Sequence, residues 1–60
     1  MARFVKFYAD KGNISNYLYT FKVKTEMRAL KVIKKFKNVR SAYFVEKNKL
    51  GGVISSKRIL

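Results

Sequence analysis

Residues 16–24 alternate more strictly between apolar and polar side chains than any other segment of the chain. In an extended strand, one face carries Tyr17, Tyr19, Phe21 and Val23. The other face carries Leu18, Thr20, Lys22 and Lys24. A row of three aromatic rings and a valine needs a covering layer in water. We therefore predict a strand over 16–24 whose aromatic face packs against another element.

The next segment has the pattern of a helix that could supply this cover. Thr25 is a typical N-cap residue, and Glu26 suits the positive end of the helix dipole. Residues 26–37 then place one apolar stripe at helical spacing, formed by Ala29, Leu30, Ile33 and Phe36. Asn38 is predicted to end the helix in the left-handed conformation.

Three other segments are rich in aromatic and β-branched residues and are predicted as strands, at 3–9, 39–47 and 53–59. Turns are expected at 10–13 and 47–52, the second with its tip at Asn48-Lys49 or at Gly51-Gly52. The result is a single α+β domain over residues 1–60 in ββαββ order, with one helix on one face of an antiparallel sheet. The strand order 2-1-3-4 makes every neighbouring pair antiparallel.

One face of this sheet is expected to remain open, because a single helix covers only one side. With Val5 and Phe7 turned inward, the first strand shows Phe4, Lys6 and Tyr8 to the open side. In the third strand we expect Val39, Tyr43 and Val45 to face inward, which leaves Arg40 and Phe44 outside.

Composition excludes most classes of chemical site. The chain has no Cys and no His, so it forms neither a disulfide nor an ordinary zinc, iron–sulfur or haem site, and we expect no metal or other cofactor. Its only acidic residues are Asp10, Glu26 and Glu46, each with a simple structural role as a turn former, a helix-dipole partner or a surface charge. We predict no catalytic residues and no enzyme activity. Gly51-Gly52 lacks the spacing of nucleotide-binding loops.

The sequence also bears on location and origin. The start of the chain carries no apolar run of signal-peptide length, and no stretch approaches the ~20 apolar residues of a membrane span. We therefore expect a cytoplasmic protein. The abundance of Lys, Asn, Ile, Phe and Tyr is typical of AT-rich genomes such as those of bacterial viruses or plasmids.

The strongest functional signal is the charge. Fifteen Lys and Arg stand against three Asp and Glu, a net charge of +12 that favours an anionic partner. Cations that neutralise phosphates, interleaved with rings that stack on unpaired bases, predict a nucleic-acid-binding protein, with duplex DNA favoured over RNA. The predicted binding residues on the open sheet face are Lys6, Lys22, Lys24, Arg40, Phe4, Tyr8 and Phe44.

Other readings of the same residues remain open. The outer face of the helix forms a second basic surface, with Arg28, Lys31, Lys34 and Lys35. An apolar open sheet face is also typical of a homodimer interface. The chain could instead be a virus- or plasmid-encoded inhibitor that docks on an acidic host protein, or its basic helix could lie on an anionic membrane.

Overall fold

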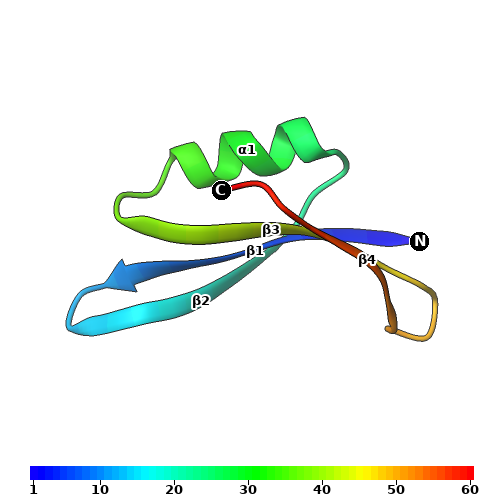
Figure 1. The fold of residues 1–60 in the computed structure, drawn as a ribbon, viewed down its shortest axis with the longest axis horizontal. Coiled ribbons are helices and arrows are strands. Elements are labelled where there is room, and N and C mark those ends of the chain that lie inside the picture. Colours follow the sequence, from blue (N-terminus) through cyan, green and yellow to red (C-terminus); the bar gives the residue numbers. More distant parts are fainter.

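The computed structural model describes all 60 residues and places one helix over one face of a four-stranded sheet (Figure 1). The elements are β1 (Ala2–Lys11), β2 (Ile14–Lys22), α1 (Glu26–Lys34), β3 (Val39–Lys47) and β4 (Val53–Arg58). The strand order is β2-β1-β3-β4, and all three pairings are antiparallel. The predicted α+β fold, its ββαββ order and its strand order are confirmed. No helix is long and apolar enough to cross a membrane.

The core lies between α1 and the two central strands. Seven buried apolar residues form one cluster: Val5, Phe7 and Ala9 of β1, Ala29 and Ile33 of α1, and Ala42 and Phe44 of β3. Phe7 is fully buried and is the largest side chain in this state. Because burying one such ring stabilises the fold by about 1.5–3 kcal/mol, this small cluster supplies much of the stability of the domain.

The helix begins where the sequence predicts but ends earlier. The Thr25 hydroxyl accepts a hydrogen bond of 3.2 Å from the backbone N–H of Arg28, which confirms Thr25 as the N-cap. The last helical residue is Lys34, three residues before the predicted end at residue 37. The next N–H groups bond three residues back, from Phe36 to the Ile33 carbonyl at 3.1 Å, so the chain tightens and leaves the helix axis. Asn38 is left-handed as predicted, with φ of 59°, but it lies beyond the helix cap.

The turn between β3 and β4 is organised by the Asn48 side chain. Its Oδ1 accepts hydrogen bonds from the backbone N–H groups of Leu50 and Gly52, both at 2.9 Å. The N–H of Gly51, which has a φ of 85°, donates to the Asn48 carbonyl at 3.0 Å. The tip is therefore Lys49-Leu50, between the two sequence positions that we considered.

The predicted faces of β3 are largely wrong. Phe44 is buried at 9% exposure against the helix, whereas Tyr43 and Val45 lie on the other face with Lys6 and Phe4 of β1. Val45 is nevertheless buried there, at 4% exposure. A β-bulge at residue 40 explains the error: Tyr8 pairs with Ser41 and Ala9 pairs with Val39, so one residue of β3 has no partner on β1. The bulge reverses the alternation, so Val39 packs against the core as predicted while the residues after it change face.

Candidate nucleic-acid interface

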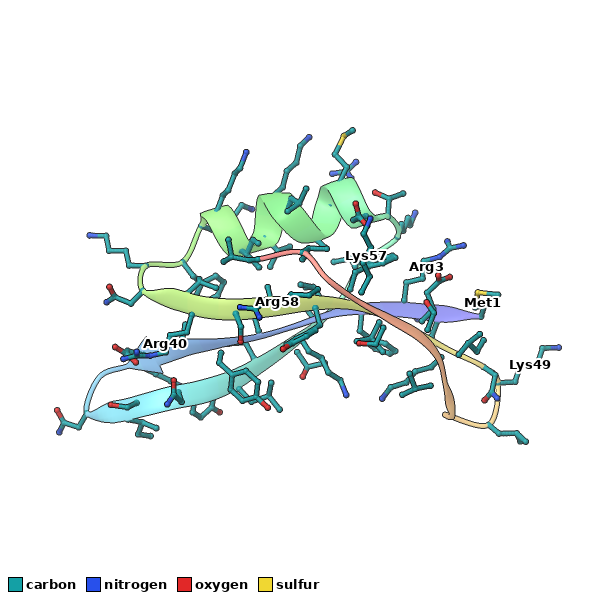
Figure 2. The ribbon with its side chains drawn as sticks, viewed as in Figure 1. Met1, Arg3, Arg40, Lys49, Lys57 and Arg58 are labelled. Carbon is teal, nitrogen blue, oxygen red and sulfur yellow. The ribbon has the colours of Figure 1, made fainter.

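The three carboxylates of the chain are all engaged in ion pairs. Glu46 pairs with Arg3 at 3.1 Å, Asp10 with Arg40 at 3.3 Å, and Glu26 with Lys57 at 3.0 Å. Figure 2 shows Lys57 rising from β4 toward the helix and Arg40 at the far end of the sheet from Lys49. The other 12 basic side chains have no acidic partner within the protein, and their charge is free to act on an external anion.

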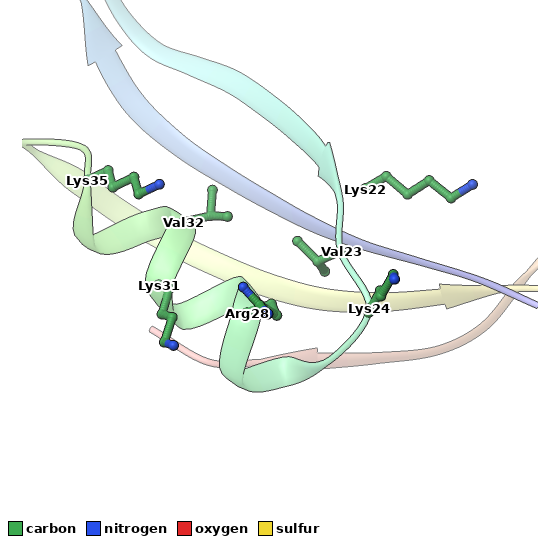
Figure 3. Close-up of a pocket in the computed structure, with 7 residues that line it drawn as sticks. All are labelled: Lys22, Val23, Lys24, Arg28, Lys31, Val32 and Lys35. Atoms are coloured by element: carbon green, nitrogen blue, oxygen red, sulfur yellow. The ribbon is translucent and has the colours of Figure 1, made fainter.

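Five of these free cations line one cleft between the end of β2 and α1 (Figure 3). The cleft has a volume of about 610 Å³, and we call it the basic cleft. Its lining consists of Lys22, Val23, Lys24, Arg28, Lys31, Val32 and Lys35. In Figure 3 the two valines lie along its middle, and Lys24 and Arg28 flank it from the strand side and the helix side.

Local structure explains why the cations meet here. Residues 28, 31 and 35 are spaced by three and four positions, so their side chains run along one side of the helix. The segment from β2 to α1 is held against β1 by two hydrogen bonds: the Val23 N–H donates to the Arg3 carbonyl at 3.0 Å, and Arg3 Nη1 donates to the Lys24 carbonyl at 3.1 Å. These bonds bring Lys24 back beside the helix.

The chemistry of the basic cleft suits a polyanion. No carboxylate lines it, so the five cations repel one another in the free protein. Binding of phosphate groups relieves that repulsion and releases counterions from the nucleic acid. The floor formed by Val23 and Val32 adds apolar contact but no competing acceptor.

A second, shallower hollow lies on the open face of the sheet. We call it the sheet groove; it has a volume of about 320 Å³. Its lining consists of Lys6, Tyr8, Leu18, Tyr43, Val45, Val53 and Ser56. In antiparallel strands the paired residues share a face, and the pairs Lys6–Tyr43 and Tyr8–Leu18 place this lining on the side away from α1.

The structure separates the residues predicted for the open face. Lys6 and Tyr8 line the sheet groove, and Phe4 lies nearby with the Lys47 ammonium 5.2 Å from its ring centre. Arg40 is held by Asp10, and Phe44 is in the core, so Phe44 is not available to a ligand.

Lys22 pairs with Phe4 on the open face as predicted, and it also borders the basic cleft, whereas Lys24 is placed differently from the prediction. We expected Lys24 on the strand opposite the helix cations, but β2 ends at Lys22, so Lys24 lies beyond the strand and lines the basic cleft together with the helix. Of the second basic surface, Arg28, Lys31 and Lys35 line the cleft, whereas Lys34 does not.

Sequence reasoning missed the groove residues Tyr43, Val45 and Val53. The signal that could have found them is weak, because residues 42–45 are apolar at every position and suit either face. Comparison of the chain with protein-family models, with curated proteins and with solved structures gives no match.

Proposed function

We propose that this protein binds nucleic acid, DNA before RNA, by neutralising phosphates in the basic cleft, and that it acts without catalysis. The observation that carries the proposal is the gathering of five cations in one cleft with no carboxylate among its lining residues. Each carboxylate of the chain is committed elsewhere to Arg3, Arg40 or Lys57. A folded domain accepts such uncompensated repulsion most readily when a polyanion relieves it.

The spacing of the helix cations supports a nucleic-acid backbone as the ligand. Arg28 and Lys35 are seven positions apart, which is about 10 Å along a helix at 1.5 Å per residue. One DNA strand rises about 3.4 Å along the duplex axis per phosphate, so a row of about 10 Å is long enough to contact more than one phosphate. Lys22 and Lys24 lie on the other wall of the cleft and extend the cationic surface.

Duplex DNA is the first form to test because it has the highest density of phosphates. We place this activity in the cytoplasm, where nucleic acid is accessible. The same cations would also attract an acidic protein, as expected of an inhibitor that docks on a host protein. The two partners differ in what they offer the cleft: phosphates in a regular row, or carboxylates on flexible side chains.

The test is a binding titration of the full chain, followed by fluorescence anisotropy, against labelled duplex DNA, RNA and polyglutamate of matched net charge. We expect duplex DNA to bind at least tenfold more tightly than polyglutamate at the same salt concentration. Equal affinity for polyglutamate and DNA contradicts the proposal and favours an acidic protein partner. Lys34→Glu is the matched control for charge, since Lys34 is on the same helix outside the cleft.

A further inference from the structure

The sheet groove leaves aromatic rings without partners. Every close ring pair in the structure lies on the helix side, among Phe7, Tyr17, Tyr19, Phe21 and Phe36. Tyr8 and Tyr43 belong to none of these pairs, and Tyr8 is 38% exposed. Both rings line the sheet groove, on the face opposite the helix (Figure 1).

The rim of the groove is cationic. Lys6 lines it, and the strand pairings place four basic residues on this face, namely Lys6, Lys22, Lys47 and Arg58. The only carboxylate at the alternating positions of this face is that of Asp10, which is neutralised by Arg40 at 3.3 Å. Glu46 and Glu26 bind partners on the helix side. The groove thus combines an apolar, aromatic floor with an unbalanced positive rim.

We propose that the sheet groove binds unpaired nucleobases, which stack on Tyr8 and Tyr43 while the rim cations contact the adjoining phosphates. This inference rests on the proposed function, since it names the part of the nucleic acid that the second surface receives. Stacking of bases on aromatic side chains is tolerant of sequence, because every base has a flat π-face. The result is a preference for DNA with a single-stranded portion over blunt duplex.

Charge complementarity favours this occupant over a second copy of the chain. A two-fold contact through the groove would set four basic residues against four identical ones, and the one carboxylate of the face, Asp10, is already paired with Arg40. A nucleotide strand brings one negative charge with each flat base, so its phosphates can pair with the rim cations while its bases stack on the tyrosine rings.

Lys22 connects the two surfaces. It pairs with Phe4 on the open side of the sheet and also lines the basic cleft, and in Figure 3 its side chain extends away from the helix. Lys22 lies at the end of the edge strand β2, so a strand of DNA can pass from the cleft around this edge to the groove.

The experiment compares a blunt duplex with the same duplex carrying a single-stranded oligothymidine tail. We expect the wild-type protein to bind the tailed duplex about 5–100-fold more tightly, and Tyr8→Ala to lose that gain. Tyr8→Phe keeps the ring and should keep the gain. Tyr17→Ala is the matched control, because Tyr17 is 36% exposed on the helix side and should leave the gain unchanged.

A measurement on the wild-type protein checks the result without any variant. On addition of oligothymidine, the ring proton shifts of Tyr8 and Tyr43 should move in NMR spectra while those of Tyr17 stay in place. Equal affinity for tailed and blunt duplexes overturns the inference, and so does an equal loss of the gain in Tyr8→Ala and Tyr17→Ala. If the wild-type protein sediments as a dimer and Tyr8→Ala sediments as a monomer, the groove binds a second copy of the chain instead. Blunt-duplex binding in the same titrations tests the proposed function separately.

Discussion

The ring of Phe36 meets the ring of Phe7 edge to face, with the centroids 4.9 Å apart and the planes at 63°. Phe36 lies two residues beyond the end of α1, where the chain has left the helix axis. Its ring also lies 4.8 Å from Tyr19 and 5.8 Å from Phe21 of β2. This cluster holds the carboxyl end of α1 over β1 and β2.

Phe36→Ala should destabilise the fold by about 2–4 kcal/mol, less than the largest losses for Phe because Phe36 is half-buried. A chain of this length has a total stability of roughly 3–9 kcal/mol, so the variant should melt well below the wild type. Urea denaturation followed by circular dichroism measures the change. A loss below 1 kcal/mol, about that of a surface substitution, would show that the helix is held by other contacts.

Phe44→Ala and Tyr43→Ala test the faces of β3. Removing the buried Phe44 ring should cost about 3–5 kcal/mol, enough to unfold most of the protein. Removing Tyr43, which lies on the open face, should cost less than about 1.5 kcal/mol. Denaturation of both variants tests this: Phe44→Ala should have a lower unfolding midpoint than Tyr43→Ala. A lower midpoint for Tyr43→Ala would contradict the bulge at residue 40 and the assignment of Phe44 to the core.

Charge reversal tests the basic cleft from both walls. Lys24→Glu and Arg28→Glu should each weaken duplex DNA binding about tenfold, or about 1.4 kcal/mol, because both side chains line the cleft. Lys34→Glu makes the same change of charge on the same helix but should cost less than about threefold, since Lys34 does not line the cleft and makes no direct contact there. Anisotropy titrations at one salt concentration compare the three. Equal losses would indicate a diffuse electrostatic attraction without a cleft.

The salt dependence of DNA binding measures how many phosphates the protein neutralises. If all five cleft cations contact phosphates, the slope of log affinity against log salt on duplex DNA should lie near −4 to −5, at about −0.9 per phosphate. Lys24→Glu should make the slope shallower by about one. Titrations at several salt concentrations between about 50 and 200 mM give the slope. A flat response contradicts phosphate neutralisation altogether.

Thr25→Ala tests the junction between β2 and the helix. Loss of the bond from the Arg28 N–H to the Thr25 hydroxyl should cost about 0.5–2 kcal/mol. Thr25→Ser keeps the accepting oxygen and should behave as the wild type. Because the cap orients the first turn, we also expect Thr25→Ala to weaken DNA binding more than its stability loss explains, measured at a temperature where the variant is fully folded. Unchanged DNA affinity in Thr25→Ala would show that the N-cap does not contribute to the arrangement of the cleft cations.

Local patterns in the sequence determined the elements and their order. The alternation over 16–24, the cap at Thr25 and the turn residues near Gly12 and Asn48 act over a few residues, so they can be read without knowledge of the rest of the chain. The strand order followed from the two hairpins and the crossover, because only β1 between β2 and β3 makes every neighbouring pair antiparallel. The free positive charge was equally plain from composition.

Only the tertiary structure decided which side chains meet. The apolar run at 42–45 suits either face, and the bulge at residue 40 selected Phe44 for the core, because the strand must fit β1 on one side and the helix on the other. The grouping of Lys24 with Arg28 depended in the same way on the early end of β2 and on the bonds from Arg3. Sequence spacing places residues on a strand or a helix, but the contact between two elements depends on how their surfaces pack.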